Sequence, residues 1–237
     1  MPRFQKLNDQ LALIHAAPDE VQTLDRALAF AVTALSCDMA GVMLMTDGKI
    51  ESVAVTDPIV TAADQLQMSN NEGPCLSAIR DERSFRIHQT ATDQRWPRWG
   101  PAVADIGIHS VLSLRMEALD RHSVGSLNLY AIRSSAFDAD DIDLGASLSR
   151  HATIAYLNAR RQTSLVRAIE TRTTIGQAEG MLMERFGIDV DQAFSVLRRY
   201  SQHSNEPFRE VAREIVASRR LPAGVPDSDV ADDTPGR

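Results

Sequence analysis

Residues 165–216 read LVRAIETRTTIGQAEGMLMERFGIDVDQAFSVLRRYSQHSNEPFREVAREIV. Apolar residues recur in this stretch at alternating spacings of three and four, which is the pattern of amphipathic helices. Gly187 follows the first periodic block, at a position where helix ends favour a positive φ. Asp189, with Gln192 three residues later, is a capping-box pattern for a second helix, and Asn205 is expected to cap a third. The stretch therefore predicts a small three-helix bundle.

The apolar stripe of each predicted helix defines the expected core of this bundle. In the first helix the spacing is close to a heptad seam, and two charged residues occupy stripe positions. The stripe positions are Leu165, Ala168, Arg172, Ile175, Glu179, Leu182 and Phe186 in the first helix, Val190, Ala193, Phe194 and Leu197 in the second, and Phe208, Val211, Ala212, Ile215 and Val216 in the third.

The helical region is also the one basic segment of an acidic chain. Residues 160–220 hold 11 Arg, no Lys and 8 acidic residues, a net charge of +3, whereas the whole chain carries −7. The Arg guanidinium binds phosphate through two hydrogen bonds and stacks on nucleic-acid bases. A net charge of +3 also fits a solvated helical face with ordinary Arg–Glu pairs, so charge alone leaves both interpretations open.

A spaced motif in this region favours the nucleic-acid interpretation. Its residues are Arg172, Ile175, Gln177, Ala178, Gly180, Leu182, Met183, Ala193, Phe194, Leu197, Arg198, Ser201, Asn205, Val211 and Ala212. In order and spacing this motif resembles the ANTAR domain, an RNA-binding output module of bacterial antiterminators. One departure is Glu179, because many members of the family carry Lys at this position.

The resemblance implies binding to tandem small-loop hairpins in nascent transcripts, which lets polymerase read through. Such binding requires phosphate neutralisation and contacts to exposed loop bases, which Arg, Gln and Asn side chains supply. The expected RNA contacts are Arg172, Gln177, Arg198, Arg199, Gln202, Asn205 and Arg209.

Two motif residues have competing interpretations. Gly180 costs about 1 kcal/mol relative to Ala in mid-helix. Either a close helix–helix contact or a close RNA backbone would explain it, and we favour the helix contact. Arg172 is expected either to pair with Glu179 of a partner helix or to face RNA.

The N-terminal part of the chain has a mixed pattern. Residues 20–36 are periodic like a helix, and residues 38–55 predict a hairpin because Asp47-Gly48 is a type I′ turn signal between alternating strands. Further strands are expected at 85–88, 110–116 and 124–131, before a closing helix with an acidic first turn. The expected fold is an α+β sandwich, an antiparallel sheet with flanking helices, followed by the all-α bundle.

Several short motifs of this part resemble the GAF domain over about residues 5–158. They are Glu72-Gly73-Pro74-Cys75, Asp93-x-Arg95-Trp96-Pro97, residues 107–113, residues 125–130 and Ala136-Phe137. The resemblance implies the fold and a small-molecule ligand or other signal. It leaves the cofactor unknown, because GAF domains bind cyclic nucleotides, haem, bilins or nothing known.

Candidate chemistry in the GAF-like part is sparse. Cys75 is either a redox-sensing thiol or, as we favour, a small buried residue. His109 either lines a pocket or caps a strand, and Trp96 and Trp99 either form a pocket rim or cover the sheet. The histidines lack metal-ligand spacing, and no nucleophile triad or phosphate loop is found. We therefore expect a regulator and neither an enzyme nor a metalloprotein.

One long helix is expected to join the two parts. From Asp141 to Arg185 the pattern is interrupted only by isolated Gly145, Gly176 and Gly180. The apolar stripe shifts along this helix, which offers a route for a signal because packed helices have discrete arrangements. We also expect a homodimer formed through this helix. The alternative is that the helix packs only within one chain.

The sequence thus predicts a sensory domain at 1–158, an RNA-binding domain at 159–220 and a disordered acidic tail at 221–237. We expect a cytoplasmic protein, because two distant cysteines give no disulfide framework and no apolar run reaches the length of a membrane span. The main alternative is a ligand-sensing protein whose helical domain dimerises or binds a protein partner. A DNA-binding helix-turn-helix protein and an enzyme using Cys75 are further alternatives.

Overall fold

The computed structural model describes residues 2–120 and 122–220, and the chain divides into two compact units, residues 1–161 and 162–237. The N-terminal unit contains a five-stranded antiparallel sheet with the strand order β2-β1-β5-β4-β3. The strands are β1 (Met39–Thr46), β2 (Lys49–Val55), β3 (Phe85–Ile87), β4 (Ser110–Glu117) and β5 (Ser123–Ala131).

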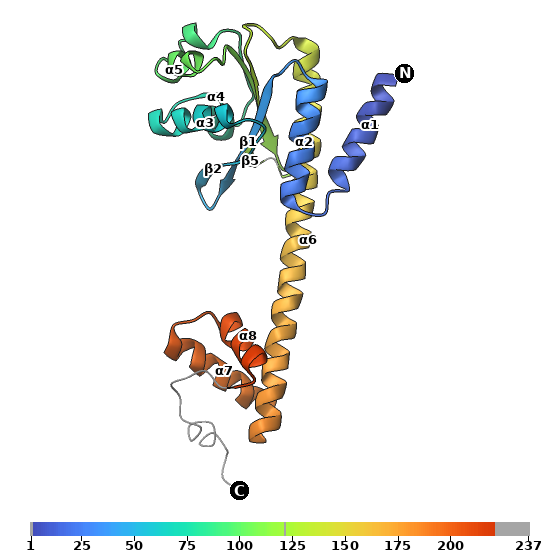
Figure 1. Cartoon of the computed structure of the whole chain (residues 1–237), viewed down its shortest axis with the longest axis vertical. Coiled ribbons are helices and arrows are strands. Elements are labelled where there is room, and N and C mark those ends of the chain that lie inside the picture. The colour runs from blue at the N-terminus through green and yellow to red at the C-terminus, as the bar shows by residue number, and fades with distance from the viewer. Residues whose placement is uncertain (1, 121, 221–237) are drawn as a thin grey trace. The chain divides into compact units, whose positions relative to one another are not determined.

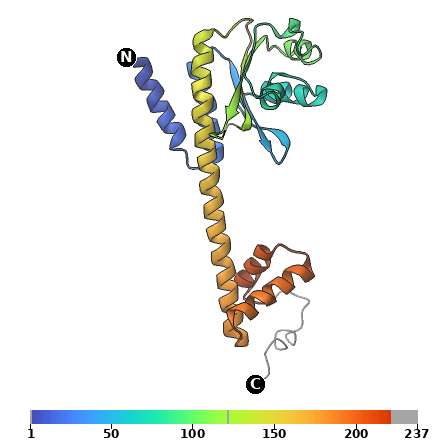
Figure 2. The ribbon, with the colours of Figure 1, turned by 180° about the vertical axis from the view of Figure 1, so that it is seen from behind.

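Helices cover both faces of this sheet (Figures 1 and 2). One face carries α2 (Glu20–Ala34) and the beginning of α6 (Ala139–Phe186), with α1 (Pro2–His15) beside them. The other face carries α3 (Pro58–Asn70), α4 (Pro74–Arg80) and α5 (Trp99–Asp105), and the short 3-10 helix η1 (Thr90–Thr92) precedes α5. The α+β sandwich expected from the sequence is confirmed.

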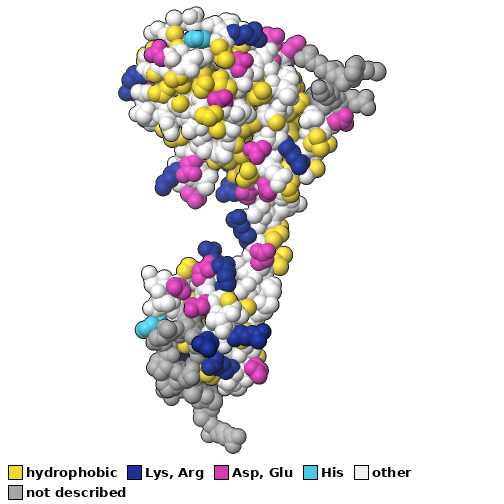
Figure 3. Space-filling model, in the orientation of Figure 1, with side chains coloured by type: hydrophobic (Ala, Val, Ile, Leu, Met, Phe, Trp, Pro, Cys, Tyr) yellow, Lys and Arg dark blue, Asp and Glu magenta, His cyan; other side chains and the backbone are white. Residues whose placement is uncertain are grey.

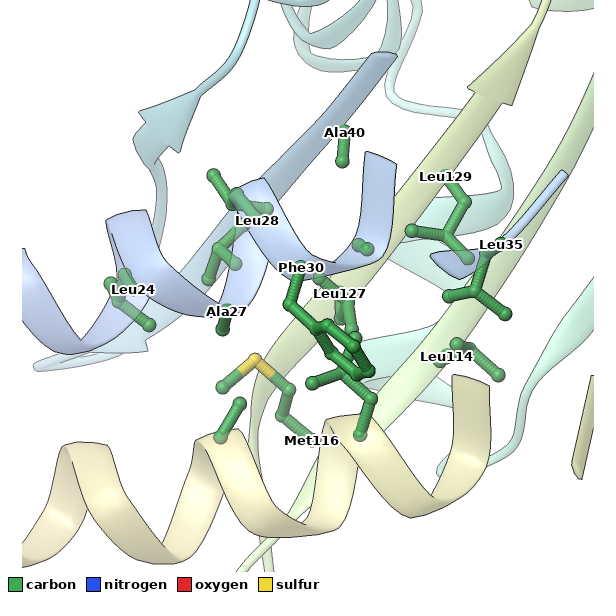
Figure 4. Close-up of a cluster of buried hydrophobic side chains, with 14 of the residues drawn as sticks. Leu24, Ala27, Leu28, Phe30, Leu35, Ala40, Leu114, Met116, Leu127 and Leu129 are labelled. Atoms are coloured by element: carbon green, nitrogen blue, oxygen red, sulfur yellow. The ribbon is translucent and has the colours of Figure 1, made fainter. Parts of the chain in front are cut away.

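The main core lies between α2, α6 and the sheet. Figure 4 shows Leu24, Ala27 and Leu28 of α2 on one side and Leu127 and Leu129 of β5 on the other. Leu127 and Leu129 are fully buried because β5 is the central strand of the sheet.

The turn between β1 and β2 has the predicted chemistry. Asp47 and Gly48 both have positive φ, 51° and 77°, as a type I′ turn requires. Gly and Asp tolerate this left-handed region better than most residues do. The turn signal in the sequence therefore located the hairpin correctly.

The C-terminal unit is built from the end of α6, α7 (Val190–Ser204) and α8 (Phe208–Ser218). Two helix ends in this unit agree with the sequence predictions. Gly187 has φ 66° and its N–H donates to the carbonyl of Met183. Asp189 and Gln192 form the expected reciprocal capping box.

Three sequence expectations for this unit are wrong. Asn205 does not cap α8 but ends α7 in the left-handed conformation, with φ 55°. Val190 and Phe194 are exposed, and Val196 and Tyr200 take their expected places in the core. The physical reason is that the buried face of α7 is the stripe Ala193, Val196, Leu197 and Tyr200, at helical spacings of three and four. Phe194 lies on the flank of this stripe, where its ring is 5.0 Å from that of Phe208.

The first half of the predicted stripe on α6 is exposed in the described part of the chain. Ala178 and Leu182 are buried in the C-terminal core, and Ile175 packs partly against it. Leu165 of the predicted stripe, by contrast, is 64% exposed, and Ile169, one turn further along and outside the predicted stripe, is 66% exposed.

The acidic tail expected to be disordered, residues 221–237, lies outside the described residues. Within the described part of the chain, every helix is too short or too polar to span a bilayer. The sequence patterns gave no indication of α5 or η1.

We expect Leu127→Ala to lower the free energy of unfolding of the N-terminal unit by about 2–5 kcal/mol, because it opens a cavity beside α2. Both tryptophans of the chain, Trp96 and Trp99, are buried in this unit, so their fluorescence in a urea titration reports its unfolding alone. Leu119→Ala is the matched control, since Leu119 is 87% exposed and its loss should cost less than about 0.5 kcal/mol. Equal effects of both substitutions would contradict the described core.

Candidate nucleic-acid interface and ligand hollow

All seven residues expected to contact RNA have exposed side chains. Two lie on α6, three on α7, one at the C-terminal end of α7 and one in the first turn of α8. Figure 3 shows basic side chains, all of them arginines, interspersed with Asp and Glu side chains on the surface of the C-terminal unit. The residues in order are Arg172, Gln177, Arg198, Arg199, Gln202, Asn205 and Arg209.

The α7 residues form the most coherent part of this set. Leu197 and Tyr200 point into the bundle core, and Arg198 and Gln202 lie on the opposite side of the helix. Arg199 is exposed on the flank. The outer face of α7 is therefore a polar surface with two adjacent guanidinium groups.

The α6 residues do not join a single surface. Arg172 and Gln177 are five residues apart, which places them about 140° apart around an α-helix. They lie on opposite flanks of α6, so one RNA stem cannot contact both through the same face. Asn205 has a structural reason for its identity, because Asn tolerates the left-handed conformation that ends α7.

A polar hollow of about 600 Å³ lies between α6 and α8, within the C-terminal unit. It brings together two arginines that were not among the seven, Arg167 and Arg213, with Arg209, which was. In α8, the carboxylate of Glu210 accepts a hydrogen bond from Arg209 at 3.2 Å and forms a second ion pair with Arg213. The lining residues are Arg167, Glu170, Thr171, Thr174, Arg209, Glu210 and Arg213.

Gly180 makes no close helix–helix contact within the described part of the chain. A Cβ atom built on Gly180 would meet no other atom within 4 Å, and the same holds for Gly176. The close contact that would explain a mid-helix glycine is therefore absent inside one chain. Contact with another molecule stays a prediction.

In the N-terminal unit, Cys75 is fully buried in a polar cluster (Tyr130, Asp64 and Ser52). Its thiol lies 3.3 Å from the hydroxyl of Tyr130, which donates to Asp64 at 3.0 Å, and Ser52 donates to the same carboxyl at 2.6 Å. Burial, and then the charge of Asp64, raise the pKa of the Cys75 thiol to about 12. The thiol therefore stays protonated, which supports the buried-residue interpretation over redox sensing.

The residues of the GAF-like motifs act mainly in folding. The carboxylate of Glu72 accepts from the backbone N–H groups of Arg98 and Trp99, at 2.5 and 2.8 Å, and so holds the start of α5. Trp99 is fully buried and donates its indole N–H to the carbonyl of Ala63. Trp96 is 4% exposed and packs against Phe85, so both tryptophans are core residues.

A second, open hollow of about 800 Å³ lies at the β1–β2 hairpin and the ends of α3 and α4. Its apolar residues are Met45, Ile50, Met68, Leu76 and Ile79, its basic residues are Lys49, Arg80 and His122, and its acidic residues are Glu51 and Glu82. Apolar walls with a few polar groups are typical of ligand sites. His109 is not among its lining residues, and the described residues contain no cluster of three or more His, Cys, Asp or Glu that could hold a metal ion.

Comparison with known families agrees with both resemblances. A family model of the GAF domain matches residues 17–156, which is more than half of the chain, and a model of the ANTAR domain matches residues 163–216. The chain therefore belongs to the GAF domain family and has a GAF–ANTAR architecture. Both are sensor and regulatory domains.

Solved structures similar to this chain share its GAF fold. The GAF domain of an Acinetobacter phosphoenolpyruvate-protein phosphotransferase is 12% identical and has a TM-score of 0.55, covering 69% of this chain and 98% of that one. The corresponding domain from Coxiella burnetii is 16% identical with a TM-score of 0.55, covering 68% of this chain and 96% of that one. No curated protein matches the chain.

The buried Asp64 carboxyl predicts a pH-dependent stability. Burial raises its pKa from 3.8 to about 6, although hydrogen bonds from Ser52 and Tyr130 act in the opposite direction. The folded state therefore binds more protons than the unfolded state between these values, and stability falls as pH rises through about 6.

Relative to Asp64→Asn, the parent protein should lose on the order of 2–3 kcal/mol of unfolding free energy between acidic and neutral pH. Urea titrations of both proteins from pH 5 to pH 7.5, followed by tryptophan fluorescence, measure the part of this change that falls above pH 5. A difference in unfolding free energy between the parent protein and Asp64→Asn that stays constant with pH would contradict a raised pKa of Asp64.

Proposed function

We propose that this protein is an RNA-binding regulator of transcription antitermination. In this proposal the GAF domain senses a signal and the ANTAR domain binds tandem hairpins in nascent transcripts. The observation that carries the proposal is the ANTAR match at residues 163–216, together with the exposed face of α7 that presents Arg198, Arg199 and Gln202. A regulator of nascent transcripts acts in the cytoplasm, and the proposed activity is binding and not catalysis.

The α7 face has the chemistry for hairpin loops. Guanidinium groups neutralise phosphate and stack on unpaired bases, while the amide of Gln202 has both a donor and an acceptor for base edges. RNA can contact only one side of α7, because Leu197 and Tyr200 on the opposite side are buried in the bundle core.

A homodimer through α6 fits the same proposal. Leu165, Ile169, Gly176 and Gly180 follow one another at spacings of four, seven and four, so they share one face of the helix. This face carries large exposed apolar groups at one end and two glycines without neighbours at the other. A second copy of α6 would bury the apolar groups and approach closely at the glycines, and the two RNA-binding units would match two hairpins.

The hollow beside the β1–β2 hairpin is the proposed site for a small-molecule signal. Its apolar side chains favour a ligand with an apolar body, and its lining of Lys49, Arg80 and His122 together with Glu51 and Glu82 favours polar groups on that ligand.

One alternative has an observation in its favour. The exposed stripe of α6 also fits a GAF protein whose helical domain only dimerises or binds a protein partner. The RNA experiment separates the two functions.

We expect the full-length protein to bind a two-hairpin, small-loop RNA more tightly than a loop-scrambled control. The affinity should fall with salt, because phosphate contacts release counterions. In fluorescence anisotropy, Arg198→Ala/Arg199→Ala should weaken binding by about tenfold or more, since two guanidinium contacts are lost.

Arg83→Ala/Arg86→Ala is the matched control for this double variant. It removes the same charge from two exposed arginines of the GAF domain and should leave RNA affinity nearly unchanged. Equal affinities of the parent and the α7 variant would remove this face from the proposal. No binding of either RNA would favour the dimerisation or protein-docking alternative.

We expect Leu165→Asp/Ile169→Asp to convert the protein from a dimer to a monomer in sedimentation velocity, because charges would be placed in a helix–helix contact. Val21→Asp provides the control, as Val21 is 66% exposed on α2 and lies outside this face. A parent protein that sediments as a monomer at micromolar concentration would contradict the dimer, whatever the variants do.

A further inference from the structure

The polar hollow between α6 and α8 has the composition of an anion site. Three of its seven lining residues are arginines, two are glutamates and two are threonines, so no large apolar side chain lines it. The arginines come from two helices that are distant in sequence: Arg167 from α6, and Arg209 and Arg213 from α8. Guanidinium groups converging from two elements favour phosphate, which accepts several hydrogen bonds at once.

The first turn of α8 adds to this preference. Its N-cap residue is Pro207, which makes no side-chain capping hydrogen bond. The first N–H groups of a helix attract anions through their unpaired hydrogens and the helix dipole. Arg209 and Glu210 lie in this same turn and line the hollow, while the cap residue Pro207 lines a neighbouring hollow together with Glu210 and Arg213.

Glu210 now takes the place of an anion in the hollow. Its two carboxylate oxygens contact different arginines, one Arg209 and the other Arg213. All three side chains are partly or largely exposed, so these ion pairs are weak and exchangeable. A phosphate carries more charge and more acceptor oxygens than one carboxylate, and can therefore displace it.

We propose that this hollow binds a backbone phosphate of the RNA ligand, and that Glu210 competes with the phosphate for Arg209 and Arg213. This inference rests on the proposed RNA-binding function and extends its surface from α7 to α6 and α8. It assigns a binding role to Arg167 and Arg213, and an opposing role to Glu210. RNA affinity is thus set partly by an ion pair inside the domain.

The first test uses the full-length protein and the two-hairpin RNA in a salt series. Arg167→Ala/Arg213→Ala should weaken binding and reduce the slope of log affinity against log salt by about 1, the value for one lost phosphate contact. Glu210→Gln keeps the size of the side chain and releases both arginines, and should strengthen binding by about three- to tenfold.

The matched control is Glu214→Gln, which makes the same change of charge on the same helix. Glu214 is exposed and is not a lining residue of this hollow. An equal gain from Glu214→Gln and Glu210→Gln would show a general charge effect and overturn the proposal. Helicity measured by circular dichroism should be the same for all variants, so that a change in affinity reports the contact.

The possible results separate this inference from the proposed function. If the parent binds the RNA and neither Arg167→Ala/Arg213→Ala nor Glu210→Gln changes the affinity or the salt slope, the hollow is not a phosphate site, while RNA binding stands. If neither the parent nor Glu210→Gln binds RNA, both proposals fail. Calorimetry with inorganic phosphate is the third arm: tight binding without RNA that is lost in Arg167→Ala/Arg213→Ala would assign the hollow to a free anion instead.

Discussion

Helix α6 supports both hydrophobic cores of this protein. Near its beginning, Leu148 and Ala152 are fully buried against α2 and the sheet. Near its end, Ala178 and Leu182 are buried against α7 and α8. A helix that contributes to two cores must shift its apolar stripe between them, and the stretch around Leu165 and Ile169 is where apolar side chains remain exposed. The α+β unit and the helical unit therefore both depend on the packing of one 48-residue element.

Local signals allowed the sequence to predict much of this architecture. The Asp47-Gly48 turn, the Gly187 helix end and the capping box at Asp189 depend on a few neighbouring residues, and all three are confirmed. The errors fall where a distant element decides. Phe194 fits an apolar period of α7, but the face that packs in the core with α6 and α8 is formed by Ala193, Val196, Leu197 and Tyr200, which leaves Phe194 on its flank. Asn205 suits either end of a helix, and the path of the following chain determines which one it occupies.

The same division holds for the candidate site. The exposure of Arg198, Arg199 and Gln202 followed from helix periodicity, so the sequence was sufficient for these three residues, whereas Arg172 is exposed although it occupies a position of the predicted apolar stripe. The hollow formed by Arg167, Arg209 and Arg213 was not predictable, because it depends on how α8 packs against α6. In the sequence, Glu210 is one of many acidic residues found in the first turn of a helix. Its two ion pairs, visible only in the structure, indicate that its carboxylate occupies the place of an anion.

Charge explains why short-range contacts matter so much here. The chain carries a net charge of −7, and its helical region only +3, so long-range attraction to a polyanion is weak. At physiological ionic strength, salt also screens the attraction between charges that are more than about 8–10 Å apart. An RNA ligand would therefore be selected by guanidinium groups at contact distance and by two linked binding units in a dimer. The carboxylate of Glu210 beside Arg209 and Arg213 would then have a large effect on RNA affinity, because few other positive charges compensate for it.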